Sequence, residues 1–241
     1  MFRYPLQTAA GLAAASYDAR RHASVAPRVL RSLDEDDVQA HMLDNRVLLI
    51  PGSNSVMDYL KFNLQVLTVR GKGYAISGGE TERGASGTLW HKGFLRHAAA
   101  IFDWVEEHGA TPRYIIGHSL GAAAAQILCM SWRVHGIGFA APRPRRNPAP
   151  VALGRYCLLV NRDDDIVPKL PYWFHHMGRV HVAPTPRWRL LPGHAMPHYR
   201  ATVAQELAKG RLPHNWPPVQ RTSTTPLSTA RPQPLPASFS P

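Results

Sequence analysis

The stretch YIIGHSLGAAAAQIL, residues 114–128, constrains the fold most strongly. A bulky apolar run ends at Gly117, Ser119 follows, and an alanine-rich run begins directly after Gly121. The apolar run predicts a buried strand, and the alanine-rich run predicts a helix. Glycines on both sides of a serine predict a sharp turn between these two elements. The sequence therefore predicts a strand, a tight turn carrying a serine, and a helix that begins at once.

The rest of the middle of the chain repeats this alternation. Helical spacing of apolar residues predicts a helix over 94–109. Strands that are apolar throughout and separated by helices indicate a mostly parallel sheet covered on both faces. The predicted fold class is therefore α/β. The strand predictions are 46–50, 113–117, 136–140, 155–160 and 179–183.

Length and composition predict one main domain with two extensions. The chain has 241 residues, 44% of them hydrophobic, which is enough for one sizeable core. Residues 1–44 are interpreted as an N-terminal helical extension packed on the core, with the acidic run at 32–37 as a helix N-terminus. Residues 45–210 are predicted to form the α/β domain. Residues 211–241, rich in Pro, Ser and Thr, are predicted to be a disordered tail.

Charge and cysteine content limit the partners and the compartment. The net charge is +12 with histidines neutral, which favours contact with anionic surfaces. The two cysteines, Cys129 and Cys157, fall in apolar runs and are predicted to be buried free thiols. No metal site and no cofactor are predicted. No apolar run is long enough for a transmembrane helix, and the N-terminus is a poor signal peptide. We expect a cytoplasmic protein, or one exported without a signal peptide.

Ser119 has two interpretations. In the structural one, it merely caps a helix, and no partner groups are needed elsewhere. In the functional one, residues 117–121 are a G-x-S-x-G nucleophile elbow, and an acid and a histidine follow in the order Ser, Asp, His. Both do follow. An apolar strand ends in three aspartates at 163–165, and a loop before a predicted helix carries His194 and His198.

Seven segments carry motifs of a known family in the right order: VLLIPGSNSVMDYLKFNL from residue 47, LWHKGFL from 89, IIGHSLGAA from 115, GFAAPRPRRN from 138, DIVPKLP from 165, HHMGRVHV from 175 and GHAMPHY from 193. These segments resemble class 3 lipases, which are α/β-hydrolases, over about residues 45–205. The resemblance implies Ser119 as nucleophile, Asp165 as the acid that orients the histidine, and His194 in preference to His198 as the base. It also implies an oxyanion hole formed by Ser53 and the Leu120 N–H. Pro51 stands where the family usually has arginine.

The resemblance implies hydrolysis of carboxylic esters of lipids, as in a triacylglycerol lipase or a phospholipase. Residues 56–63 occupy the lid region of the family and alternate apolar with polar side chains. An apolar lid face suits an acyl chain, and a cationic surface suits peripheral contact with an anionic membrane.

Three alternatives remain. A soluble short-chain or feruloyl-type esterase would use the same catalytic residues. A catalytically silent binding module on the hydrolase scaffold would leave activity at background. Nucleic acid is not expected as the primary partner, because the basic residues are scattered without interleaved aromatics or a recognisable binding module.

Overall fold

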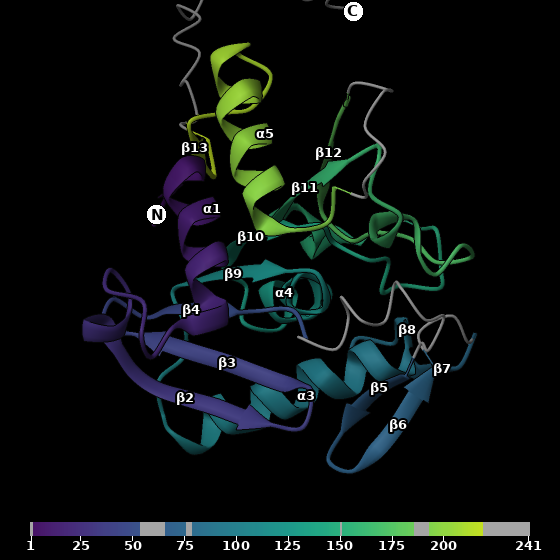
Figure 1. Ribbon diagram of the computed structural model, residues 1–241. Coiled ribbons are helices and arrows are strands. Elements are labelled where there is room, and N and C mark those ends of the chain that lie inside the picture. The colour runs from purple at the N-terminus through teal and green to yellow at the C-terminus, as the bar shows by residue number, and fades with distance from the viewer. Residues whose placement is uncertain (1, 54–65, 76–78, 150, 186–192, 219–241) are drawn as a thin grey trace, which may run out of the picture.

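The computed structural model describes residues 2–53, 66–75, 79–149, 151–185 and 193–218. A seven-stranded sheet forms the centre, in the order β12-β11-β10-β9-β4-β3-β2 (Figure 1). Its strands are β2 (Val29–Glu35), β3 (Val38–Leu43), β4 (Val47–Ile50), β9 (Tyr114–His118), β10 (His135–Phe139), β11 (Cys157–Arg162) and β12 (Arg179–Ala183).

Five neighbouring strands, β4 and β9 to β12, run parallel. All five strand predictions match these elements to within two residues at each end. The predicted helix over 94–109 corresponds to α3 (Lys92–Glu107). The carboxyl ends of the parallel strands lie at one edge of the sheet. This places the segments after β9, β10 and β11 beside one another.

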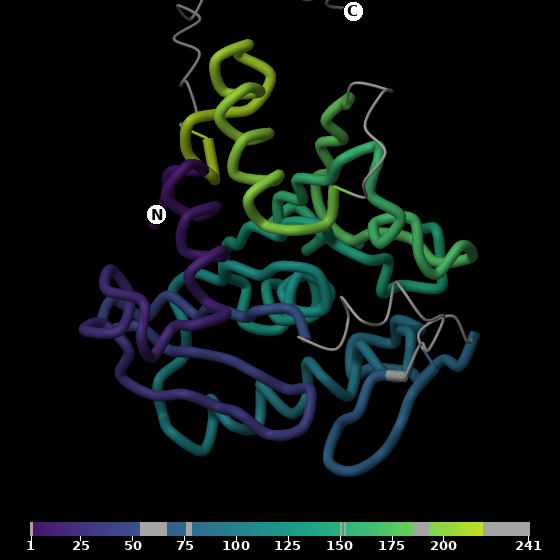
Figure 2. The backbone as a smooth tube through the Cα atoms, viewed as in Figure 1, coloured from purple at the N-terminus to yellow at the C-terminus, as the bar shows by residue number. Residues whose placement is uncertain are grey.

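Helices cover both faces of the sheet, which confirms the predicted α/β class. On one face α3 packs beside α4 (Leu120–Ser131); on the other α1 (Leu6–Ala15) packs beside α5 (Met196–Ala208) (Figures 1 and 2). Successive side chains of a strand point to opposite faces of the sheet. In β4, Leu48 and Ile50 belong to the core under α3 and α4, whereas Val47 and Leu49 belong to the core under α1 and α5. A strand buried on both faces shows no polar alternation in its sequence, which is why these runs are apolar throughout.

The prediction of a helix N-terminus at 32–37 is wrong. These residues form the end of β2 and the turn to β3, and the two strands pair antiparallel with Glu35 opposite Val38. Asp36 adopts φ 52°, which Asp tolerates better than most residues and which a two-residue hairpin turn requires. Residues 29–43 therefore belong to the same sheet as the domain that was predicted to begin at residue 45.

The predicted tail starts too early. Leu212 and Trp216 are buried beside α1 and α5, and β13 (Asn215–Trp216) pairs antiparallel with β1 (Tyr4–Pro5). Residues 211–218 are thus part of the folded unit, and residues 219–241 of the predicted tail lie outside the described residues. Two small antiparallel sheets complete the fold: β5 (Val66–Val69) with β6 (Lys72–Ala75), and β7 (Thr81–Arg83) with β8 (Leu89–His91).

Both cysteines are free and buried, as predicted. Among the described residues, every helix is too short or too polar to cross a membrane.

Candidate active site

Ser119 lies at the turn between β9 and α4 with φ 53° and ψ −122°. A non-glycine residue pays a strain cost of the order of 1–3 kcal/mol in such a sparsely populated conformation. The strain persists because the helix passes very close to the neighbouring strand. A Cβ added to Gly121 would lie 2.1 Å from the Ile50 carbonyl oxygen, so only glycine fits there. The sequence predicted this sharp turn from its two glycines.

Ser119, His194 and Asp165 form a hydrogen-bonded chain. The Ser119 Oγ lies 2.9 Å from His194 Nε2, and His194 Nδ1 lies 2.8 Å from Asp165 Oδ2. All three side chains are at most 2% exposed, so the chain is shielded from bulk water. The three residues come from segments 29 to 75 positions apart, yet lie in one contact network. Of the two candidate histidines, His194 makes the contact with Ser119.

The surroundings of Asp165 favour its ionised form. Burial alone would raise the pKa of this carboxyl. The hydrogen bonds from His194, Tyr199 and the Val167 N–H outweigh burial, and the pKa is lowered. The Tyr199 hydroxyl donates to Oδ2 at 2.8 Å, and the Val167 N–H donates to Oδ1 at 3.0 Å. The carboxylate of Asp165 accepts a hydrogen bond from His194 Nδ1–H, which leaves Nε2 to accept one from the Ser119 hydroxyl.

The three consecutive aspartates have three different partners. Asp163 accepts the Thr185 N–H at 2.9 Å, and Asp164 forms an ion pair with Arg162 at 2.7 Å. Only Asp165 contacts His194. Asp165 is thus the carboxylate that can orient His194, whereas Asp163 and Asp164 bind other parts of the chain.

The segment with Ser53 lies directly against the elbow. A Cβ added to Gly52 would lie 2.8 Å from the Ser119 Cβ, so the backbone approaches the serine as closely as it can. The Ser53 side chain is buried, and its hydroxyl donates to Asp37 Oδ1 at 2.7 Å. Leu120 is the first residue of α4, where main-chain N–H groups have no partner within the helix. The predicted lid, residues 56–63, lies outside the described residues.

A second network ties the elbow to two other loops. The His118 Nε2 lies 3.0 Å from the carbonyl oxygen of His194, and its Nδ1 contacts the Tyr17 hydroxyl. That hydroxyl also accepts the Gly52 N–H at 3.0 Å. Burial, and then the neighbouring His194, lower the pKa of His118 to about 3, so the ring is neutral. The carbonyl oxygen of His194 can only accept a hydrogen bond, so the proton of the His118 ring is on Nε2. The His118 Nδ1 therefore accepts a hydrogen bond from the Tyr17 hydroxyl.

Sequence reasoning missed Tyr17, Asp37 and Tyr199. Tyr199 had a signal, since it stands within the matched segment GHAMPHY, but no role followed from that position. Tyr17 contacts a residue 101 positions away, and no local pattern marks it. Asp37 was hidden inside the acidic run that was interpreted as the start of a helix.

In the described ranges, no set of histidine, cysteine or acidic side chains has the arrangement of a metal site.

Comparison with solved structures identifies the fold. The native Rhizomucor miehei lipase propeptide complex matches with a TM-score of 0.50 at 19% identity, covering 74% of this chain and 67% of that one. Lipase II from Rhizopus niveus matches with a TM-score of 0.51 at 18% identity, covering 73% and 79%. Lip2 lipase from Yarrowia lipolytica matches with a TM-score of 0.50 at 14% identity, covering 75% and 78%.

The resemblance to class 3 lipases is thereby confirmed at the level of the fold. No family model and no curated protein matches the sequence.

Proposed function

We propose that this protein is a serine hydrolase that cleaves carboxylic esters of lipids through an acyl-enzyme. One observation carries the proposal: the buried chain from Ser119 Oγ through His194 to Asp165, with links of 2.9 and 2.8 Å. A capping serine would need neither partner. The three solved structures with this fold are lipases, which supports the reaction class.

In the first step His194 Nε2 takes the proton of Ser119 as Oγ attacks the ester carbonyl. The imidazolium so formed is stabilised by the ionised Asp165, and it then protonates the leaving alcohol. Tyr199 and the Val167 N–H keep Asp165 charged and fixed in position. In the second step His194 activates water, which releases the acid and restores the serine.

The negative charge on the carbonyl oxygen needs donors beside Ser119. We assign the N–H groups of Leu120 and Ser53 to this oxyanion hole, because both lie in segments packed against the serine. The Ser53 hydroxyl is engaged by Asp37, so its role in this assignment is to anchor the loop. One such donor is typically worth about 3 kcal/mol of barrier in serine hydrolases.

A lipid substrate is favoured by the surface next to Asp165. Ile166, Tyr172 and Trp173 are 37%, 64% and 76% exposed, although large apolar side chains usually pack inside. Tyr and Trp with one apolar and one polar end suit a membrane interface. This segment follows β11, at the edge of the sheet where Ser119 lies.

Basic side chains surround the same segment. Arg143 donates to the carbonyl of Tyr172, and Arg146 donates to that of Trp173. Within the described ranges neither guanidinium forms an ion pair, so both charges remain available to anionic headgroups. We therefore propose that this surface contacts an anionic lipid interface.

Ester hydrolysis tests the catalytic proposal. The wild type should hydrolyse a chain-length series of p-nitrophenyl esters, and Ser119→Ala and His194→Ala should each lower kcat by roughly 10⁴-fold or more. Ser86→Ala and His198→Ala are the matched controls and should retain activity. Equal background rates for the wild type and Ser119→Ala would instead support the silent binding module.

Vesicle binding and hydrolysis test the lipid proposal. Trp173→Ala should reduce binding to anionic vesicles and hydrolysis of their lipids, while the rate on a soluble acetate ester stays unchanged. Leu30→Ala is the control. It removes a side chain that is 61% exposed on β2, the outer strand farthest from β11 and β12, and should change neither vesicle binding nor hydrolysis of vesicle lipids. A wild type faster on monomeric than on micellar esters would favour the soluble short-chain or feruloyl-type esterase.

A further inference from the structure

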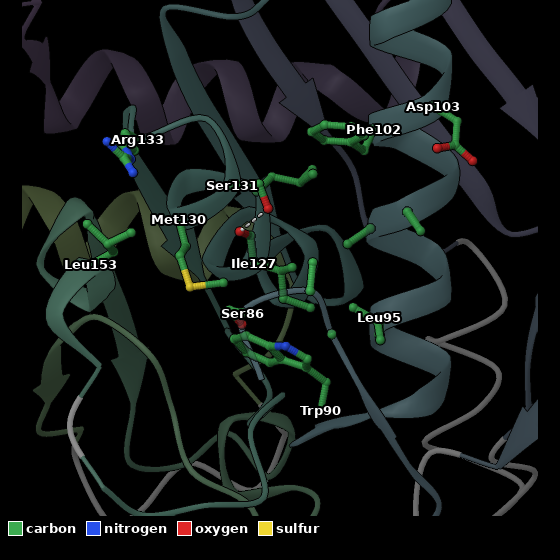
Figure 3. A pocket seen from close by; sticks show the side chains of 15 residues that line it. Ser86, Trp90, Leu95, Phe102, Asp103, Ile127, Met130, Ser131, Arg133 and Leu153 are labelled. Atoms are coloured by element: carbon green, nitrogen blue, oxygen red, sulfur yellow. Dashed lines mark hydrogen bonds between the residues drawn. The ribbon is translucent and has the colours of Figure 1, made fainter. Parts of the chain in front are cut away.

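A cavity of about 450 Å³ opens between α3, α4 and the β7–β8 hairpin (Figure 3). We call it the α3–α4 cavity. Its walls are mostly apolar, and its size lies in the usual range of small-ligand sites. It is lined by Gly84, Ala85, Ser86, Trp90, Leu95, Ala98, Ala99, Phe102, Asp103, Ile127, Leu128, Met130, Ser131, Arg133 and Leu153.

Small side chains on one face of α3 leave space for this cavity. Leu95, Ala98, Ala99 and Phe102 have the spacing of one helical face, and the two alanines leave space where larger residues would fill it. Met130, whose flexible thioether side chain adapts to an apolar ligand, contributes from α4.

This cavity is separate from the candidate active site. None of Ser119, Asp165, His194, Leu120 or Ser53 lines it. Its wall on α4 begins at Ile127, eight residues beyond Ser119, which corresponds to about 12 Å along a helix.

The charges around the cavity select the kind of ligand. Asp103 is paired with Arg70 at 3.0 Å, and the Ser131 hydroxyl is bound to the Ile127 carbonyl at 3.1 Å. Arg133 is exposed at the rim, and in the described part of the chain no carboxylate lies within ion-pair distance of it. It also holds φ 54° at the end of α4, where glycine is the usual residue. The cavity thus combines an apolar interior with one unpaired cation.

We propose that the α3–α4 cavity binds a fatty carboxylate, with the alkyl chain between the two helices and the carboxylate on Arg133. Burial of the chain supplies most of the affinity, and a guanidinium pairs well with a carboxylate through parallel hydrogen bonds. The lining of the cavity by itself selects this class of ligand. Under the proposed function, such a carboxylate is also a product of the same protein.

Binding of laurate by isothermal titration calorimetry tests the proposal, with dodecanol as the uncharged probe of equal chain length. All binding measurements use the Ser119→Ala variant, and neither probe is an ester, so failure of the proposed activity leaves the test intact. Arg133→Gln should weaken laurate binding about tenfold, the lower end for a charge-assisted hydrogen bond, and leave dodecanol binding unchanged. Arg200→Gln, an exposed position on α5 at the other face of the sheet, is the matched control and should change neither.

Ala99→Leu tests the position of the alkyl chain. Leucine is nearly as good a helix former as alanine, so the fold should persist, which thermal unfolding checks. Laurate and dodecanol binding should both fall at least tenfold, while hydrolysis of a short soluble ester by the otherwise wild-type chain stays unchanged. Absence of laurate binding would overturn the proposal. Laurate binding that neither Arg133→Gln nor Ala99→Leu weakens would also overturn it, because the ligand would then bind elsewhere, for example at Ser119.

Discussion

His97 is a buried histidine whose replacement should stabilise the protein. It lies on α3 and is 1% exposed, and neither ring nitrogen has a hydrogen-bond partner among the residues that the structure describes. Burial lowers its pKa from 6.5 to about 4, with the Asp37 charge acting in the opposite direction. Leucine has a similar size and no polar atoms. We therefore expect His97→Leu to raise the free energy of unfolding.

The expected gain has two parts. Removing unsatisfied polar atoms from the interior is worth about 1–3 kcal/mol at pH 7. As the pH falls below 6.5, the unfolded chain binds a proton at His97 that the folded chain binds only near pH 4, so the wild type loses stability over this range. At pH 5 this loss amounts to about 2 kcal/mol. The total gain from His97→Leu should thus increase from about 2 kcal/mol at pH 7 to about 4 kcal/mol at pH 5.

Urea unfolding of the wild type and the variant at pH 7 and pH 5 measures both parts. His22→Leu, at an exposed position, is the control and should shift stability by less than about 0.5 kcal/mol at pH 7. A destabilised His97→Leu variant would refute the claim that the ring is an unsatisfied polar group. A gain of the same size at both pH values would refute the lowered pKa.

The other predictions concern the candidate active site. Tyr199→Phe removes a hydrogen bond that lowers the pKa of Asp165, so this pKa should rise, kcat should fall several-fold, and the acid limb of the pH profile of kcat should move to higher pH. An unchanged pH profile would contradict this role of Tyr199. Tyr17→Phe removes the acceptor of the Gly52 N–H and should lower kcat more than it changes KM, measured on a soluble ester; a change in KM alone would argue against loop positioning. Gly121→Ala should destabilise the fold by at least about 2 kcal/mol in urea unfolding, and a neutral result would refute the close approach of helix and strand.

The parallel part of the sheet was predictable because its strands are apolar on both faces. β9, β10 and β11 appear in the sequence as short apolar runs between helices, and no other common architecture buries such runs. β2 and β3 were missed for the opposite reason. β2 is largely exposed, with polar residues between Leu33 and the turn, and its acidic end resembles the first turn of a helix as much as a hairpin. Pairing with β3, a contact between segments, decides between the two.

The candidate triad was predictable because each member stands at a sequence landmark. Ser119 lies between glycines, Asp165 ends an apolar strand, and His194 precedes a helix. The choice among Asp163, Asp164 and Asp165 followed from the resemblance to a family, since the residue types are identical. Only the fold distinguishes them, by giving Asp164 to Arg162 and Asp165 to His194.

The second network, which joins Tyr17, Gly52, His118 and His194, could not be predicted from the sequence. Tyr17 is a tyrosine after an alanine-rich helix, with nothing local to distinguish it from a core residue. Its hydroxyl acquires a role only when folding brings to it Gly52, from the segment after β4, and His118, the last residue of β9. His118 then passes the connection to the backbone of His194. A neutral His118 is required, because a protonated ring could not accept the Tyr17 proton, and burial supplies that neutrality. The loops that carry Gly52 and His194 are thus held through the core of the protein as well as through the hydrogen bonds of the candidate triad.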